Sequence, residues 1–206
     1  MNRLSLIAVA ALAMSASAAA ATSPTWTPDL VHSRAQFTVS HLVVSKVWGH
    51  IPIRQMTIES HPGSAIPDRI DAVLDVSHED TDNHDRDRDL RSATYFDVTK
   101  YPSITFKSTK VEEKGPDDFS VTGDLTIKNV TKPVTFPVHV EGIVPDEKGG
   151  TRVGYTASLR IDRRDWGIVD NTLSAVGVLL VGYDVDIGLT AEAVTNDPAL
   201  HPHKSR

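Results

Sequence analysis

Apolar and polar residues alternate along much of this chain. Within residues 34–40, the apolar residues Ala35, Phe37 and Val39 are separated by polar ones. The same alternation returns in residues 70–77, 119–127, 134–140, 153–161 and 183–189. Successive side chains of a β-strand point to opposite faces of a sheet. The pattern therefore predicts a series of strands, each with one apolar and one polar face.

The number of these strands indicates the fold class. Apolar segments at residues 26–30, 51–58 and 104–111 bring the total to about eight or nine, which is typical of a small closed barrel. Lys128-Asn129 predicts a tight turn, because Asn tolerates a positive φ. We predict an all-β fold, an antiparallel barrel of about eight strands. Such a barrel either fills its interior with side chains or encloses one small ligand, and the alternation leaves both open.

Two segments interrupt the alternation. Residues 41–48 are too continuously apolar for a half-exposed strand and predict a short helix or a rim loop. Residues 83–99 carry Leu90, Ala93 and Phe96 at helical spacing and predict one or two short helices. Arg and Asp alternate just before Leu90, so this segment is also densely charged. We place both segments at the mouth of the barrel.

The first residues have the three parts of a secretory signal peptide. Arg3 supplies a positive start, residues 4–14 are an apolar run, and small residues continue to Ala21. We therefore expect residues 1–21 to be a signal peptide, cleaved after Ala18 or Ala21, and the protein to be secreted to the periplasm. The apolar run is shorter than the roughly 18 residues that a membrane span needs, and no later segment is long enough. We expect a protein that is not membrane-embedded.

The rest of the chain is expected to form one domain, residues 22–195, followed by a tail. Residues 196–206 contain two Pro and no apolar periodicity, which predicts a disordered tail. The formal net charge is −6 and no cluster of Lys and Arg is visible, which argues against nucleic acid or an anionic lipid surface as a partner. The chain has no Cys, which excludes a disulfide scaffold and thiol catalysis.

The sequence contains no recognisable catalytic or metal motif. No G-x-S-x-G, H-E-x-x-H or Walker pattern is present. The chain has nine His, but their spacing does not bring three or four ligands together. We expect no catalytic residue, no metal and no cofactor. An enzyme that uses Asp87 or Asp89 as a general base near Arg86 stays open as an alternative.

Short motifs follow one another along the chain: His32-Ser33, His41-Leu42, Arg86-Asp87, Leu90-Arg91-Ser92, Phe96-Asp97, Lys100-Tyr101-Pro102, Thr131-Lys132-Pro133-Val134, and Arg163 with Asp165 and Gly167. Together they span residues 25–194, and they resemble the successive signatures of the YceI-like polyisoprenoid-binding proteins. The resemblance implies an extended lipocalin-like antiparallel β-barrel in the periplasm that encloses a polyisoprenoid-type lipid and has no catalytic activity. A homodimer is implied by the resemblance alone.

The candidate ligand contacts form two groups. The inward faces would hold the lipid chain through Phe37, Val39, Leu74, Phe106, Phe119, Leu125, Phe136, Tyr155 and Leu159. The mouth would hold the head group through His41, Arg86, Asp89 and Arg91, since a guanidinium offers paired donors to phosphate or carboxylate. Alternatively, these arginines pair with neighbouring Asp residues on a solvated face. Asp89 stands where the family usually has His, which changes the expected head-group preference.

Burial of the lipid chain is expected to supply most of the affinity, because each buried CH₂ contributes about 0.8 kcal/mol. The mouth would then orient the ligand. Two other functions stay open: an enzyme that processes a lipid head group, and an interaction module of the envelope with a solid interior. The second would be a stress-response or membrane-redox partner.

Overall fold

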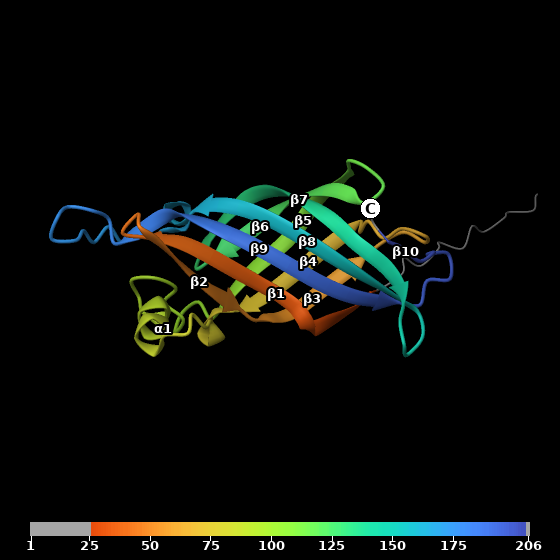
Figure 1. Ribbon diagram of the computed structural model, residues 1–206, viewed down its shortest axis with the longest axis horizontal. Helices are drawn as coiled ribbons and strands as arrows, with labels where there is room; N and C mark the ends of the chain where they lie inside the picture. Colours follow the sequence, from red (N-terminus) through yellow and green to blue (C-terminus); the bar gives the residue numbers. More distant parts are fainter. Residues whose placement is uncertain (1–25, 205–206) are drawn as a thin grey trace, which may run out of the picture.

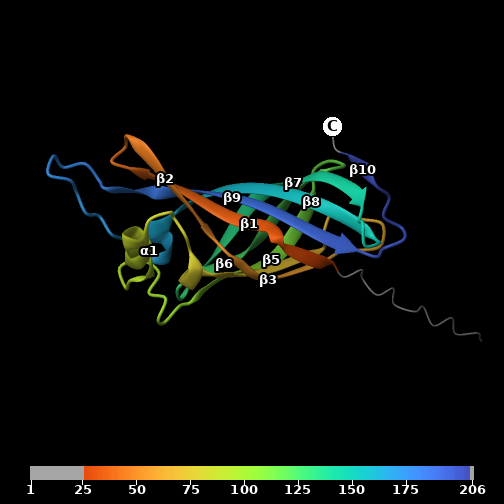
Figure 2. The ribbon, with the colours of Figure 1, turned by 60° about the horizontal axis from the view of Figure 1, so that its bottom comes forward.

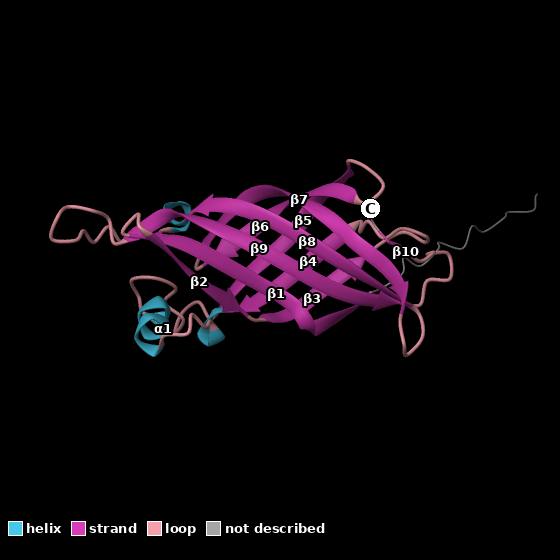
Figure 3. Cartoon of the chain, viewed as in Figure 1, coloured by secondary structure: helices cyan, strands magenta, loops and turns pink. Residues whose placement is uncertain are grey.

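A computed structural model describes residues 26–204 of this chain, so the predicted signal peptide lies outside the described residues. The fold is almost entirely strand (Figure 1; Figure 3). The long strands are β1 (Thr27–His41), β2 (Ser45–Ile51), β3 (Ile53–Glu59), β4 (Arg69–Asp75), β5 (Ser103–Glu113), β6 (Asp118–Ile127), β7 (Val130–Pro145), β8 (Thr151–Asp162) and β9 (Val181–Thr195). The short elements are β10 (His203–Lys204), α1 (His84–Arg91) and the 3-10 helices η1 (Val76–His78) and η2 (Arg163–Trp166).

The long strands form one antiparallel sheet that curls into a barrel. Their order is β2-β1-β9-β8-β7-β6-β5-β4-β3, so the first strand pairs with the last long one. The two end strands, β2 and β3, are separated only by Pro52, which changes the pairing partner from β1 to β4. The N–H of Trp26 donates to the carbonyl oxygen of Ile58 at 3.1 Å and ties the start of β1 to β3. The predicted all-β barrel is confirmed.

The segment at residues 41–48 is neither a helix nor a loop. It completes β1, turns at residues 42–44 and starts β2, with His41 paired to Ser45. Leu42 and Val43 take positive φ angles of 50° and 64°, which non-glycine residues seldom adopt. The prediction was wrong because the apolar side chains of a protruding hairpin tip do not have to alternate between a core and solvent.

The predicted helix in the charged segment is confirmed over the residues of α1. Asn83 caps its first turn, where the Asn83 side chain accepts a hydrogen bond from the N–H of Arg86. Asp85 and Asp87 lie in the first turn and Arg91 lies in the last, which suits the helix dipole. Figures 1 and 2 show α1 at the same end of the barrel as the β1–β2 hairpin. We call this end the mouth.

The described part of the C-terminal tail, residues 196–204, packs on the barrel. The side chain of Leu200 is only 6% exposed. Asp197 accepts a 2.6 Å hydrogen bond from the N–H of Gly63, and β10 pairs with β7. One buried Leu and a few backbone contacts hold this segment, and these are too few to produce a periodic pattern in the sequence.

Candidate functional site: an apolar cavity in the barrel

The barrel encloses a cavity of about 250 Å³. An apolar cavity of about 150 Å³ is already large enough to bind benzene. All of the residues predicted to face the interior line this cavity: Phe37, Val39, Leu74, Phe106, Phe119, Leu125, Phe136, Tyr155 and Leu159. Period-two alternation was sufficient to identify them, because it fixes which face of a strand each side chain occupies. That they contact a ligand stays a prediction.

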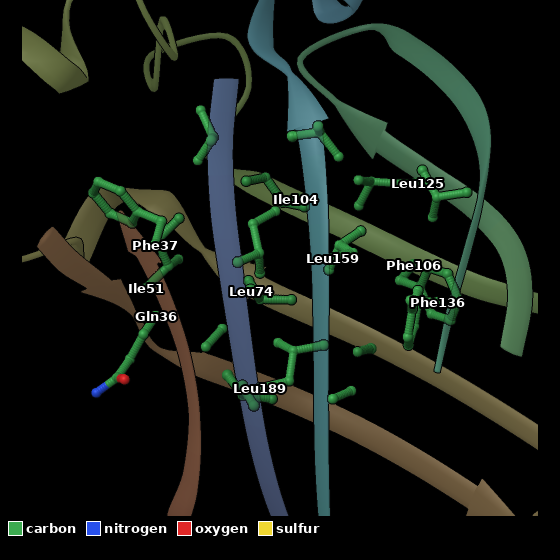
Figure 4. Close-up of a pocket in the computed structure, with 18 of the residues that line it drawn as sticks. Gln36, Phe37, Ile51, Leu74, Ile104, Phe106, Leu125, Phe136, Leu159 and Leu189 are labelled. Atoms are coloured by element: carbon green, nitrogen blue, oxygen red, sulfur yellow. The ribbon is translucent and has the colours of Figure 1, made fainter. Parts of the chain in front are cut away.

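Inward-facing side chains between the middle of the barrel and the mouth are only half buried. Leu74, Leu159 and Leu189 come from three different strands and converge on the same space in Figure 4. Side chains of a filled core are close-packed and have almost no accessible surface. The partial exposure of these three leucines therefore shows that the mouth half of the barrel is hollow. The prediction that left a filled and a hollow barrel open is settled in favour of the hollow one.

The other end of the barrel is filled and forms the floor of the cavity. Phe119 and Tyr155 meet edge to face with ring centroids 6.2 Å apart, and Phe119 is 1% exposed. The Tyr155 hydroxyl donates to the carbonyl oxygen of Ala65 at 2.7 Å, so the phenol has a partner. Burial raises the pKa of Tyr155 and keeps it neutral. The floor is therefore solid and uncharged.

A glycine shapes the wall of the cavity between floor and mouth. The rings of Phe106 and Phe136 lie 5.4 Å apart between centroids. Gly123 lies on the neighbouring strand β6, and a Cβ at this position would clash with the Phe106 ring. The absence of a side chain at Gly123 thus leaves room for the Phe106 ring against β6.

The mouth is covered by apolar side chains of α1 and the turns that follow it. Leu90, Tyr95 and Phe96 line the cavity from this side. The Tyr95 hydroxyl donates to the Asp170 carboxylate at 3.1 Å and joins this cover to residues 167–180. The helical spacing of Leu90 and Phe96 was visible in the sequence, but the charges around them directed attention to the arginines instead.

The predicted head-group residues do not line the cavity. Arg86 donates through Nε and Nη2 to the hydroxyl and carbonyl oxygens of Thr81, at 2.8 and 2.5 Å. Arg91 donates to the Glu79 carbonyl and forms a 3.0 Å ion pair with its carboxylate. Asp89 is exposed, and His41 is half buried at the end of β1. Arg86 and Arg91 therefore fix α1 to the segment that precedes it, and their partners are not the Asp residues that the sequence suggested.

Glu79 is the most unusual ionisable group at this end of the barrel. Its side chain is fully buried, whereas the side chain of Arg91 is 39% exposed. Burial raises the pKa of the Glu79 carboxyl, and the charge of Arg91 opposes this only in part. The ionised form of Glu79 is therefore less favourable in the folded protein than in the unfolded chain.

We expect the pH dependence of stability to reveal this carboxylate. Because the pKa of Glu79 is raised above 4.5, its contribution to stability is fully present below that pH and is lost as the pH rises through the raised value. Glu79→Gln removes the ionisation, so the free energy of unfolding of the variant minus that of the wild type should increase as the pH rises. Urea denaturation between about pH 4 and pH 8 measures this difference. A difference that falls with pH would show that the ion pair with Arg91 outweighs burial.

Arg163 is the one charged residue among the side chains that line the cavity. It is 5% exposed, and its guanidinium donates to the carbonyl oxygens of Gly182, Ile168, Asp170 and Val181 at 2.9, 2.6, 2.6 and 3.0 Å. These contacts occupy most of its five N–H donors. Arg163 thus holds residues 167–180 to the start of β9. The sequence showed it only as part of a family motif and gave no sign of this role.

The described residues contain one group with metal-ligand chemistry, and it does not fit a metal. Ligand atoms of Asp29, His32 and Glu192 lie within 4.8 Å of one another. Arg152 already reaches between them and lies 2.8 Å from Asp29 and 2.7 Å from Glu192. Hydrogen bonds from Arg152 and His32 hold the pKa of Asp29 well below its usual range. A guanidinium, and not a metal ion, neutralises this cluster.

A family model and a relative in sequence indicate the same family. A model of the YceI-like domain matches residues 26–193. Protein YceI of Shigella flexneri is 35% identical over 137 residues, which are 66% of this chain and 71% of that protein.

Solved structures show the same fold. Burkholderia cenocepacia BcnA has a TM-score of 0.68 at 23% identity, covering 81% of this chain and 99% of that one. A polyisoprenoid binding domain from Saccharophagus degradans has a TM-score of 0.60 at 12% identity, covering 82% of this chain and 98% of that one. Within residues 26–204, no helix has the length and apolar character needed to span a bilayer.

Proposed function

The chain belongs to the YceI-like family, and from this premise we propose that it binds a polyisoprenoid or similar long-chain lipid in its barrel and carries it through the periplasm. The observation that carries the proposal is the hollow, apolar interior described above. A solved structure with this fold is a polyisoprenoid binding domain, which suggests the same class of ligand. The periplasmic location rests on the signal peptide expected at residues 1–21.

The lining of the cavity supports binding driven by the apolar chain. Each buried CH₂ contributes about 0.8 kcal/mol, so a few isoprene units supply about 8 kcal/mol, which corresponds to micromolar affinity. Arg163, the charged residue of the lining, already donates to backbone carbonyls and has little capacity left for a head group. A head group would therefore be selected at the rim and contribute little to affinity.

The alternatives from the sequence find less support. Asp87 is buried and accepts hydrogen bonds from the N–H and hydroxyl of Thr81 at 3.0 and 2.6 Å, so it is a structural group. Asp89 is exposed and does not line the cavity. The residues proposed for an enzymatic function thus lie outside the space in which a lipid would react. An interaction module with a solid interior does not fit the cavity.

Native mass spectrometry tests the proposed function directly. Protein purified from its own host should carry a lipid, and delipidated protein should take up an added polyprenyl phosphate. A straight-chain alkyl phosphate of similar length is the matched control, because it shares the head group and the apolar chain but lacks the branched isoprene units. A clean ligand-free mass together with no uptake of the polyprenyl phosphate would refute the proposal. Equal uptake of both lipids would refute the preference for an isoprenoid.

A further inference from the structure

Two neighbouring segments at the mouth expose large apolar side chains to solvent. The tip of the β1–β2 hairpin, residues 42–48, presents Val43, Val44 and Trp48. The loop at residues 167–180 presents Val169, Leu173 and Val176. Their exposures are 79, 84, 57, 61, 58 and 84% in that order. We call these two segments the mouth tips. Contiguous apolar groups of this kind on a soluble protein mark an interaction site.

The mouth tips are held side by side. The N–H of Leu42 donates to the carbonyl oxygen of Leu180 at 3.0 Å, and His41 pairs with Val181 across β1 and β9. Figures 1 and 2 show both segments projecting together beyond the strands. The exposed side chains therefore belong to one end of the molecule and are not scattered over it.

The charge of the mouth tips differs from that of the whole chain, whose formal net charge is −6. Lys46 is the only Lys, Arg, Asp or Glu in residues 42–48, and it forms a 3.2 Å ion pair with Asp186 on the barrel wall. Asp170 is the only such residue in residues 167–180, and it accepts hydrogen bonds from Tyr95 and Thr172. The tips thus offer an apolar surface with one charge of each sign, both bound within the protein. This composition suits an uncharged apolar phase and neither an acidic nor a basic partner.

The loop at residues 167–180 borders the cavity. Ile168 and Val181 line the cavity, and they are the direct chain neighbours of the exposed Val169 and of Leu180. A chain that moves between a bilayer and the cavity exposes CH₂ groups to water over any gap between them, and the cost grows with every group exposed, so tips that border the cavity favour transfer. Trp48 adds a side chain that favours the boundary between hydrocarbon and water.

We propose that the mouth tips dock this protein on the surface of a zwitterionic phospholipid bilayer, with the mouth of the cavity toward the membrane. Val43, Val44 and Val176 enter the interfacial region, and Trp48 lies at its boundary. The use of this contact for lipid transfer rests on the proposed function, whereas the docking itself is independent of any bound lipid. The net negative charge of the protein makes docking weaker on an anionic bilayer than on a neutral one.

The chain contains its own reporter for this contact. Trp26 and Trp166 are 2% and 3% exposed, so Trp48 is the only one of the three tryptophans that changes its environment when the mouth tips enter a bilayer. Vesicles of phosphatidylcholine should shift the emission of the delipidated full-length mature protein to shorter wavelength. Vesicles of brominated phosphatidylcholine should quench it. Trp48→Phe should remove both effects.

Vesicle sedimentation measures the contribution of the tips. The triple variant Val43→Ser, Val44→Ser, Val176→Ser should lower partitioning to phosphatidylcholine vesicles about tenfold or more, because three exposed apolar side chains are lost. Val31→Ser is the matched control, since Val31 is 86% exposed but lies near the opposite end of β1. Partitioning of the control should equal that of the wild type. Unchanged thermal melting of both variants shows that they are folded.

Several results would overturn the proposal. Failure of the wild-type protein to bind the vesicles would do so. An equal loss of partitioning in Val31→Ser and in the triple variant would also overturn it. Sedimentation equilibrium without lipid tests whether a second copy of the chain binds the mouth tips instead. If the wild type forms a dimer, the triple variant does not, and neither binds vesicles, the tips are a dimer interface. Docking of a protein that takes up no polyprenyl phosphate would refute the proposed function and leave the docking intact.

Discussion

Ala157→Asp is expected to abolish lipid binding, whereas Ser158→Asp is expected to leave it unchanged. Ala157 lines the cavity between Val138 and Leu189 of the neighbouring strands, and Ser158, the next residue of β8, is exposed on the outer face. A carboxylate at residue 157 would be buried against the hydrocarbon of the ligand without a partner. We expect the affinity for a polyprenyl phosphate to fall about 100-fold or more, measured by native mass spectrometry.

The two variants share one chemical change and differ only in the face of the strand. Equal affinity in both would show that the ligand does not occupy the cavity. Ala157→Asn adds a side chain of nearly the same size without a charge and should bind with intermediate affinity. Thermal melting of all three variants separates loss of binding from loss of folding.

Arg163→Lys is expected to lower the free energy of unfolding by roughly 3 kcal/mol or more. The buried guanidinium donates to four backbone carbonyl groups, and each hydrogen bond to a charged group contributes about 1.5–3 kcal/mol. Lys keeps the charge, but its ammonium cannot reproduce the planar fork that reaches these carbonyls. Urea denaturation measures the loss.

Arg164 provides the control for this prediction. It follows Arg163 directly, but it is half exposed and pairs with Asp162 on the surface. Arg164→Lys should change the free energy of unfolding by less than about 1 kcal/mol, as exposed ion pairs do. Similar losses for both substitutions would contradict the role of Arg163 in holding residues 167–180 to β9.

The charged segment around α1 has a different role from the one that its sequence suggests. Its arginines donate to Thr81 and Glu79, within the segment just before the helix, while Leu90 and Phe96 cover the cavity. The charges therefore position an apolar cover. This arrangement supports our proposal that the lipid chain supplies the affinity, because the strongest donors at the mouth already have partners.

Much of the fold could be predicted from the sequence because period-two alternation is a local property. Phe37 and Val39 face inward since they lie two residues apart in one strand, whatever the rest of the barrel does. The hairpin tip at residues 41–48 could not be predicted in the same way. The side chains of Val43 and Val44 at its tip are largely exposed, so a pattern based on a buried face does not apply to them.

The candidate site was predictable in part. The sequence identified the residues that line the cavity but not the partners of Arg86 and Arg91, because those depend on how α1 docks on residues 79–81. The role of Arg163 was also hidden, since its four carbonyl partners belong to a loop and a strand whose path only the folded chain defines.

By itself, the sequence determined the strands, their inward faces, the family resemblance and the net charge. Only the tertiary structure decided that the barrel is hollow at one end and filled at the other. Whether side chains meet across a barrel depends on the number, tilt and stagger of all its strands together. In this chain, that geometry leaves Leu74, Leu159 and Leu189 half buried around an open space and packs Phe119 against Tyr155 at the floor.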